Sequence, residues 1–241
     1  MNTERQPAAT ANVDHHEIAK FDEIAHQWWD PNGEFKPLHQ INPLRLAFIE
    51  RHTTLRDRSV IDIGCGGGIL AEGLARNGAV VTAIDRAEYT LDVARMHRHE
   101  SGLEIDYRLA SAEEMAKQEP ERFAVVTCME LLEHVPDPAS LIVACAALAN
   151  PGADLFFSTL NRTAKAYALA IFGAEYVLRI LPRGTHDYAR FIRPSELAHW
   201  LRDAGLTVEH MSGITYHPLT RDYHLSDDLD VNYLVHARKP F

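Results

Sequence analysis

The sequence predicts an α/β fold: a Rossmann-like, seven-stranded, mostly parallel sheet with helices on both faces, an N-terminal helical cap and an amphipathic helical insert after the fifth strand. Three observations predict it. From residue 59 onward, short β-branched or aromatic runs alternate with helical stretches, which is typical of a parallel sheet. A glycine-rich turn joins the first run to the first helix of this series. Two further runs after residue 205 have no helix between them, which indicates a final antiparallel pair.

The N-terminal segment is predicted to be helical. Asp14 followed by Glu17 is typical of a helix start. Apolar residues then recur at helical spacing: Ile18, Phe21, Ala25 and Trp28. Residues 28–31 (Trp-Trp-Asp-Pro) should end this helix, and a second helix is expected to follow Pro43. We therefore expect a helical cap over residues 1–50 and the main domain over residues 51–241.

The main domain is predicted from its alternating runs. Five strands are expected at residues 59–63, 80–84, 105–109, 123–128 and 155–159. Four helices are expected between them, at residues 69–77, 89–100, 112–117 and 138–149. The last of these begins with Asp137 as its cap and Pro138 at its first position. After a helix over 194–204, strands are expected at 206–214 and 232–237, separated by a long polar loop.

Composition and charge exclude several classes of protein. The 241 residues are 46% hydrophobic and 24% charged, which is typical of a globular chain and not of a disordered or fibrous one. The 24 basic and 34 acidic residues give a net charge of −10, so a nucleic-acid partner is not expected. Cys65, Cys128 and Cys145 are scattered without metal or disulfide spacing, which fits a reducing, cytoplasmic location. We expect neither a signal peptide nor a membrane-spanning helix.

The glycine-rich turn predicts a ligand site. A mostly apolar run that includes Asp62 is followed by four glycines between Gly64 and Gly68, and then by a predicted helix. This pattern predicts a strand–turn–helix in which the backbone of the turn approaches a ligand closely. Asp85 lies 21 residues after Gly64, at the end of the next apolar run. A carboxylate at this place can accept hydrogen bonds from both hydroxyls of a ribose. A turn that serves helix–sheet packing alone is the alternative, and the joint occurrence of glycines and acid argues against it.

Two cofactor classes compete for this turn. The spacing Gly66-x-Gly68-x-x-Ala71 satisfies the dinucleotide fingerprint, so an NAD(P)-dependent oxidoreductase is an alternative. Asp62, however, lies inside the strand, where a dinucleotide site is usually apolar. An acid there can orient the loop or contact the ammonium of an amino-acid ligand. Because S-adenosylmethionine carries an ammonium and a ribose but no pyrophosphate, the sequence favours methyl transfer over hydride transfer.

A carboxylate–histidine cluster follows the fourth predicted strand. Glu130, Glu133 and His134 place two carboxylates and an imidazole within five residues, at the sheet edge where α/β proteins bind ligands. If this segment is a helical turn, Glu130 lies beside the other two. Methylation of a phenol requires loss of a proton with a pKa of about 10. The cluster could supply a general base or hold Mg²⁺, Mn²⁺ or Zn²⁺, and a turn with no chemical role is the remaining alternative.

The connection after the fifth predicted strand is long, basic and amphipathic. On a helical projection one side is apolar: Tyr167, Ala170, Ile171, Ala174, Val177, Leu178 and Leu181. Residues 162–193 include six basic residues, among them Arg179 and Arg183, and two acidic residues, so the local net charge is +4. This pattern predicts a contact with anionic membrane lipid or a lid over an apolar substrate site. A core-packed helix with a solvated charged face is the alternative.

Several strings of the sequence together resemble one family. The order Asp-x-Gly-x-Gly-x-Gly from Asp62, with Asp85 after it, resembles motif I of Class I methyltransferases and its acidic partner. Longer strings are similar to the ubiquinone-biosynthesis O-methyltransferases of bacteria and mitochondria: residues 21–30 ending in Trp-Trp-Asp, 34–39, 41–45, 62–72, 127–138, 156–162, 184–187 (Gly-Thr-His-Asp) and 231–233. The resemblance extends from about residue 13 to residue 237.

The resemblance implies an activity and a cofactor. The activity is S-adenosylmethionine-dependent O-methylation of polyprenylated catechol or phenol intermediates, performed twice in ubiquinone biosynthesis, on a polyprenyl hydroxyphenol and on demethylubiquinol. Another small phenol as substrate is the alternative, and a lipid-binding subunit without catalysis is a further one. The family also suggests a peripheral location on the inner membrane and other ubiquinone-biosynthesis proteins as partners.

The resemblance also implies roles for individual residues, carried over by position. The cofactor-binding residues would be Arg45 at the methionine carboxylate, Gly64 and Gly66 in the loop, Asp85 at the ribose and Met129 at the adenosyl part. The metal ligands would be Glu130, Glu133 and His134, with His134 and Glu130 as catalytic residues. The chain departs from the wider methyltransferase pattern in two places. Ala153 replaces a frequent glycine, and segment 110–113 lacks the acid at its start, so no adenine contact is assigned there.

Overall fold

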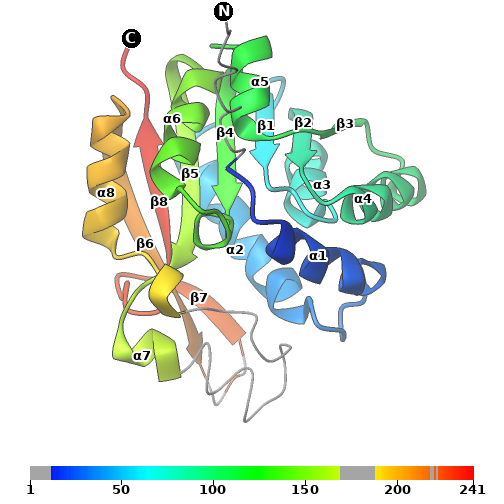
Figure 1. Cartoon of the computed structure of the whole chain (residues 1–241), viewed down its shortest axis with the longest axis horizontal. Coiled ribbons are helices and arrows are strands. Elements are labelled where there is room, and N and C mark those ends of the chain that lie inside the picture. The colour runs from blue at the N-terminus through cyan, green and yellow to red at the C-terminus, as the bar shows by residue number, and fades with distance from the viewer. Residues whose placement is uncertain (1–11, 169–187, 218–219, 221) are drawn as a thin grey trace, which may run out of the picture.

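The structure is a computed structural model that describes residues 12–168, 188–217, 220 and 222–241 (Figure 1). Its centre is an eight-stranded sheet in the order β3-β2-β1-β4-β5-β8-β6-β7. The strands are β1 (Ser59–Ile63), β2 (Val80–Asp85), β3 (Ile105–Leu109), β4 (Phe123–Met129), β5 (Ala149–Leu160), β6 (Thr207–His217), β7 (Asp222–Ser226) and β8 (Asn232–Arg238). The first five are parallel, and β8, β6 and β7 add to β5 in antiparallel pairs. The predicted Rossmann-like fold is therefore confirmed.

The sheet has one strand more than the sequence predicts. The sequence places a polar loop between the last two strands, whereas β7 forms there and pairs with β6 from Gly213↔Ser226 to His217↔Asp222. β7 is an edge strand whose side chains are exposed or half-buried. Because it needs little apolar character on either face, it gives no hydrophobic signal of the kind that predicts the central strands.

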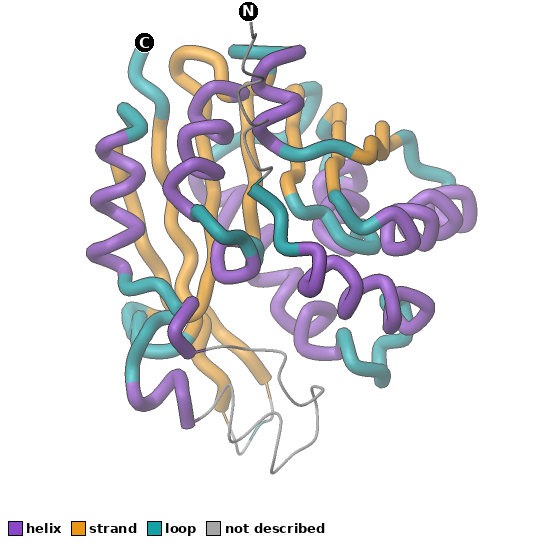
Figure 2. The backbone as a smooth tube through the Cα atoms, in the orientation of Figure 1, coloured by secondary structure: helices purple, strands orange, loops and turns teal. Residues whose placement is uncertain are grey.

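Helices cover both faces of the sheet (Figures 1 and 2). They are α1 (His15–Ile24), α2 (Lys36–His52), α3 (Ile69–Arg76), α4 (Glu88–Ser101), α5 (Ala112–Gln118), α6 (Pro138–Leu148), α7 (Ala164–Ala166) and α8 (Pro194–Asp203). Residues of α5, α6 and α8 share one hydrophobic cluster with Ile61 and Ile63 of β1, while residues of α2, α3 and α4 share another with Val60. Successive side chains of a strand point to opposite faces, so these two clusters are the two cores on either side of the sheet.

The cap helices differ from the prediction in one respect. α1 starts as predicted, because the Asp14 side chain accepts hydrogen bonds from the backbone N–H groups of His16 and Glu17. α2, in contrast, begins at Lys36 and contains Pro43 in its interior. Pro37 takes the first-turn position that the sequence analysis gives to Pro43. α2 tolerates the inner proline because buried side chains anchor the helix both before and after Pro43. These residues are Ile41, Asn42, Arg45, Phe48 and Ile49.

Candidate active site

A cavity of about 840 Å³ lies at the carboxyl ends of the parallel strands. Its lining includes the ends of β1, β2 and β4 and the residues that follow them, as α/β sheets usually arrange their ligand sites. The cap contributes α1 and Trp28 to a second wall, and β6 and β7 contribute Tyr216 and Tyr223 to a third. Almost every described residue that the sequence predicts for the site lines this one cavity: Arg45, Gly64, Gly66, Asp85, Met129, Glu130, Glu133 and His134.

The glycine loop is held between the cavity and the cap. Gly64, Gly66 and Gly68 have φ angles of +70°, +52° and +90°, a region that favours glycine. A Cβ at Gly66 would lie 2.1 Å from the Trp28 ring. The indole N–H of Trp29 donates a hydrogen bond to the carbonyl of Gly67 (2.9 Å). The tryptophan pair that the sequence analysis reads as a helix stop is therefore the outer support of the loop.

Asp85 connects the loop to the end of β2. Its carboxylate accepts hydrogen bonds from the backbone N–H of Gly66 (2.8 Å) and of Ala87 (2.9 Å). Burial raises the pKa of Asp85, and these backbone hydrogen bonds oppose the rise. The side chain is half-buried and lines the cavity. It thus lies where the predicted ribose contact requires a carboxylate.

Asp62 and Arg45 bring two opposite charges to the inner end of the cavity. Thr127 donates a hydrogen bond to Oδ1 of Asp62 (2.7 Å), whereas the buried Oδ2 has no partner among the described residues. Burial raises the pKa of Asp62 to about 7. Arg45 is buried, and its Nε likewise has no described hydrogen-bond partner. A buried polar atom without a partner is costly, so this pair fits a ligand that carries both an ammonium and a carboxylate, as the amino-acid part of S-adenosylmethionine does.

Glu130 and Glu133 lie side by side, but their pKa values are shifted in opposite directions. Glu130 Oε1 accepts hydrogen bonds from Ser158 (2.7 Å) and Asn232 (3.0 Å), and Arg45 Nη2 lies 3.1 Å from it. The pKa of Glu130 is lowered, because Arg45 and these donors outweigh burial. Glu133 is buried and accepts a hydrogen bond from Thr159 (2.8 Å). Burial, and then the negative charge of Glu130, raise the pKa of Glu133 to about 8.

The turn that carries these carboxylates differs from the helical turn considered in the sequence analysis. Glu130 has a φ of +52° and precedes a 3₁₀ turn that spans Leu132–His134. A left-handed residue does not continue into an α-helical turn, so the i, i+4 neighbourhood of Glu130 and His134 does not form. The positive φ instead accompanies a hydrogen bond from the Glu130 backbone N–H to the Ser158 carbonyl of β5 (3.0 Å).

His134 is paired with a residue that the sequence analysis did not assign to the site. Its Nδ1 lies 2.8 Å from Oε2 of Glu17 in α1, and the hydrogen bond to His134 lowers the pKa of Glu17 to about 2. Because an ionised carboxylate only accepts, Nδ1 carries the proton and Nε2 keeps a free lone pair. The Phe21 ring packs edge-on against the imidazole, with the two ring centroids 5.2 Å apart. This arrangement holds the tautomer that can accept a proton.

The predicted metal ligands do not converge in this structure. Within the described residues, one group of three His, Cys, Asp or Glu ligand atoms lies within 4.8 Å of one another, and it is elsewhere in the molecule. Glu130 and Glu133 adjoin, but His134 is turned to Glu17. As they lie, the three side chains do not fit a shared divalent ion.

Other contributors to the site also escaped the sequence analysis. Residues 110–113, for which no contact is assigned there, line the cavity. His97 does not line the cavity, but it supports the tryptophan pair: its ring stacks on Trp29 with the centroids 3.4 Å apart, and its Nδ1 lies 2.6 Å from Oε1 of the buried Glu72. Of the predicted insert residues, Tyr167 is 49% exposed, and the others lie outside the described residues: Ile171, Leu178, Arg179 and Arg183.

Glu133→Gln should remove a pH dependence of stability. Near pH 5 to 8 the folded chain keeps a proton on Glu133 that the unfolded chain, with its ordinary pKa of 4.5, has lost. The free energy of unfolding therefore falls as the pH rises through this window, by at most about 1.4 kcal/mol per pH unit. Urea unfolding at three pH values should show a flatter dependence for the variant than for the wild type. Equal slopes would mean that Glu133 is ionised in the folded protein at neutral pH.

The comparisons with known proteins agree with this geometry. The family model of the methyltransferase domain matches residues 38–211. Among solved structures, magnesium protoporphyrin IX methyltransferase from Synechocystis PCC 6803 with bound SAH has a TM-score of 0.61 at 18% identity, covering 96% of this chain and 90% of that one. A SAM-dependent methyltransferase from Thermotoga maritima has a TM-score of 0.64 at 15% identity, covering 93% and 99%.

Curated relatives are much more similar in sequence. A ubiquinone biosynthesis O-methyltransferase from Stutzerimonas stutzeri is 63% identical over 229 residues, which cover 95% of this chain and 99% of that one. Proteins of the same name from Hahella chejuensis and Thiobacillus denitrificans are each 60% identical over 229 residues, covering 95% of this chain and 96% and 99% of theirs.

Fold and site together define a Class I, S-adenosylmethionine-dependent methyltransferase. This decides between the two cofactor classes that the glycine turn left open. The sequence relatives are more specific, and the chain belongs to the ubiquinone biosynthesis O-methyltransferase family.

Proposed function

We propose that the chain transfers a methyl group from S-adenosylmethionine to an oxygen of polyprenylated catechols and of demethylubiquinol, the two O-methylations of ubiquinone biosynthesis. One observation carries this proposal. A single cavity is lined both by the glycine loop with Asp62 and Arg45 and by the Glu17–His134 pair. The same cavity is walled by apolar and aromatic side chains that suit a prenylated ring: Phe21, Leu160, Ile214, Tyr216, Tyr223 and Val231.

The chain's own residues supply what an O-methylation needs. S-adenosylmethionine, when bound, supplies a methyl group on a positively charged sulfur. His134 accepts the phenol proton at Nε2, and the Glu17 carboxylate stabilises the imidazolium that results. The phenol oxygen can then form its bond to the methyl carbon as the carbon–sulfur bond breaks.

A divalent ion at Glu130, Glu133 and His134, which the family resemblance implies, would be a second route to the phenolate. In this structure Glu130 is engaged by Arg45, Ser158 and Asn232, and Glu133 has a raised pKa. These contacts favour the histidine base. A metal role would require the His134 ring to leave Glu17 and approach the two carboxylates.

Methyl transfer from labelled S-adenosylmethionine to a short-chain prenyl catechol tests the proposal. We expect label in the phenol product, with at most a small decrease after EDTA treatment. Loss with EDTA, restored by Mg²⁺, Mn²⁺ or Zn²⁺, would move the phenolate role to the metal. Label in a small catechol that lacks a prenyl chain, at a similar kcat/KM, would contradict the assignment of the lipid substrate. Absence of label from every prenyl acceptor, with cofactor binding intact, would refute the proposed function.

A peripheral membrane location and protein partners complete the proposal, and the insert at 162–193 would provide the contact. No helix within the described ranges is long and apolar enough to cross a membrane. Three of the four described basic residues of the insert form ion pairs within the protein: Arg162 with Glu196, Lys165 with Asp228 and Asp230, and Arg190 with Asp14. The fourth, Arg193, is exposed. Attraction of the insert to anionic lipid would therefore depend on Arg193 and on Arg179 and Arg183, which lie outside the described residues.

A further inference from the structure

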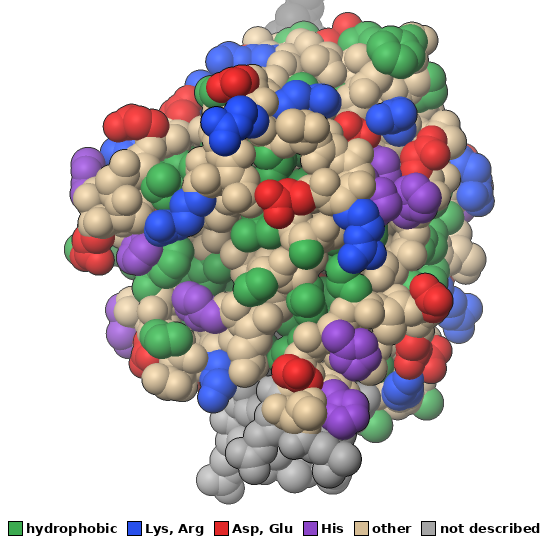
Figure 3. Space-filling view, turned by 180° about the vertical axis from the view of Figure 1, so that it is seen from behind, with side chains coloured by type: hydrophobic (Ala, Val, Ile, Leu, Met, Phe, Trp, Pro, Cys, Tyr) green, Lys and Arg blue, Asp and Glu red, His purple; other side chains and the backbone are tan. Residues whose placement is uncertain are grey.

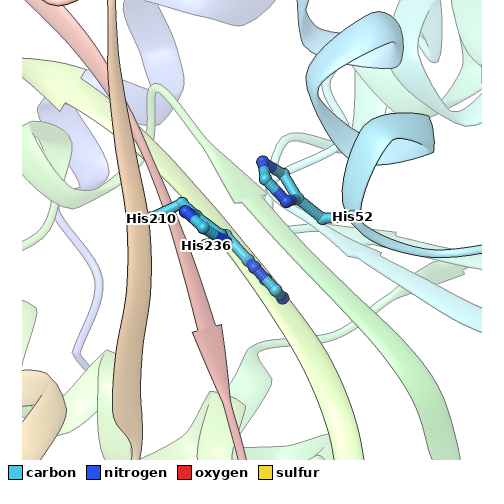
Figure 4. Close-up of side chains that lie close together, drawn as sticks. All are labelled: His52, His210 and His236. Carbon is cyan, nitrogen blue, oxygen red and sulfur yellow. The ribbon is translucent and has the colours of Figure 1, made fainter.

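Three histidines meet on the sheet at a place away from the cavity. His236 of β8 and His210 of β6 are direct register partners, and His52 at the end of α2 faces them (Figure 4). None of the three lines the active-site cavity. Exposed histidine side chains are visible on the face of the molecule seen from behind (Figure 3), and of these three residues His210 is exposed, His52 half-buried and His236 buried.

A bulge in β6 brings two of these side chains to the same face. Val208 pairs with Ala237, but the next pair is His210 with His236, so Glu209 is the extra residue. Without the bulge, residue 209 would oppose His236. Residues directly opposite one another in an antiparallel pair share a face of the sheet, so the bulge places two imidazoles next to each other. Such bulges often re-aim a side chain at a functional site.

Asp154 sets the protonation of the buried histidine. Its Oδ1 lies 3.0 Å from Nε2 of His236, and the pKa of Asp154 is lowered, since His236, Thr53 and Arg238 outweigh burial. Because the ionised carboxylate only accepts, the proton is on Nε2 and Nδ1 keeps its lone pair. That Nδ1 is buried and has no hydrogen-bond partner within the described part of the chain. His236 is 4% exposed, so solvent does not satisfy it either.

We propose that His52, His210 and His236 form a binding site for a divalent transition-metal ion of the Zn²⁺ class, separate from the active site. One nitrogen from each ring lies within 4.8 Å of the others. Three imidazoles suit Zn²⁺, Co²⁺ or Ni²⁺, with water as a further ligand. Asp154 would act as the carboxylate that orients a metal-bound histidine through its other nitrogen.

Two of the three rings must rotate to bind such an ion, because the rings are stacked and a histidine binds a metal through a lone pair in its ring plane. Tetrahedral Zn–N bonds of about 2.0–2.1 Å place ligand nitrogens about 3.4 Å apart. The rings now stack, with the His52 centroid 4.4 Å from that of His210 and 4.8 Å from that of His236. His236 is held by Asp154, so the exposed His210 and half-buried His52 are the rings that would turn. Their exposure also gives the ion a path from solvent.

Metal binding here would join the end of α2 to β6 and β8. α2 also carries Arg45, seven residues before His52 and thus on a similar side of the helix. The ion would therefore fix the helix that places Arg45 in the active site, without touching the reacting groups. A ligand that binds only the folded chain raises Tm, and at a hundredfold excess over Kd we expect an increase of about 5–10 °C.

Titration of the full-length, tag-free, chelator-treated protein with Zn²⁺ or Co²⁺ tests the proposal. The His134→Gln background removes the predicted ligand at the active site, so its metal chemistry does not contribute to the signal. We expect one ion per chain by calorimetry, the visible absorption of four-coordinate Co²⁺, and the rise in Tm. His210→Ala and His52→Gln should each lower the affinity at least tenfold. His224→Ala, an exposed histidine of β7 outside the group, is the matched control and should bind as the background does.

Each other outcome overturns the assignment. Unchanged binding in His210→Ala and His52→Gln would place the ion elsewhere. Binding that is present in the wild type and lost in His134→Gln would place it at the active site. No binding up to millimolar metal, with both histidine variants folded as judged by circular dichroism, would leave the three rings as packing partners.

Discussion

Replacing His134 with glutamine should lower kcat for methyl transfer by about 10²- to 10⁴-fold, the usual contribution of a general base. Glutamine keeps the size and polarity of the side chain but does not take up a proton at neutral pH. The affinity for S-adenosylhomocysteine should change little, because Asp62, Arg45 and the glycine loop are untouched.

Glu17→Gln distinguishes a base from a structural histidine. Glu17 holds the Nδ1 proton of His134 across 117 residues of sequence and acts only through that ring. As a positioning residue it should cause a smaller loss of kcat than His134→Gln, because the imidazole remains but loses the partner that fixes its orientation. His16→Gln, an exposed histidine of the same helix, should match the wild type. Wild-type kcat in His134→Gln, with the protein folded, would remove His134 from catalysis.

The contrast between His134 and its partner shows what local sequence can and cannot predict. The sequence places Glu130, Glu133 and His134 at the end of β4, because position in an alternating pattern determines which strand end a residue follows. It does not indicate Glu17, since a contact between a cap helix and a strand-end turn depends on how the cap packs. Glu17 appeared in the sequence only as part of a helix start, a role that its backbone N–H does play through Asp14.

The fold was predicted best where hydrophobic pattern and glycine turns act locally. β1 and β3 have the predicted bounds, and the glycines between Gly64 and Gly68 form the predicted turn between a strand and a helix. The errors arose where tertiary contacts determine the secondary structure. β7 is a polar edge strand that forms by pairing with β6. α2 continues through Pro43 because its buried side chains anchor it. Ser158 and Asn232, two of the three side-chain partners of Glu130, lie in strings 156–162 and 231–233. The family resemblance therefore pointed to both residues, whereas the hydrophobic pattern did not.

The second large effect is expected at the charged inner end of the cavity. Asp62→Asn should weaken binding of S-adenosylhomocysteine by about 10- to 100-fold, the value of a hydrogen bond to a charged group. Methylthioadenosine shares the adenosyl and sulfur parts but lacks the amino acid, so wild type and variant should bind it equally. Asp106→Asn, an exposed aspartate of β3, controls for the change of net charge and should leave both affinities unaltered.

The pH dependence of binding gives Asp62 a second, independent signature. Burial raises the pKa of its carboxyl to about 7 in the ligand-free protein, so below pH 7 the group is mostly neutral. An ammonium ligand favours the ionised form, and binding must then release a proton. The affinity for S-adenosylhomocysteine should therefore fall as the pH drops below 7, by at most about tenfold per unit, whereas Asp62→Asn should show no such fall. If the variant instead loses affinity for both ligands alike, Asp62 shapes the glycine loop through Thr127 and does not contact the ammonium. Calorimetry in two buffers of different ionisation enthalpy would measure the released proton directly.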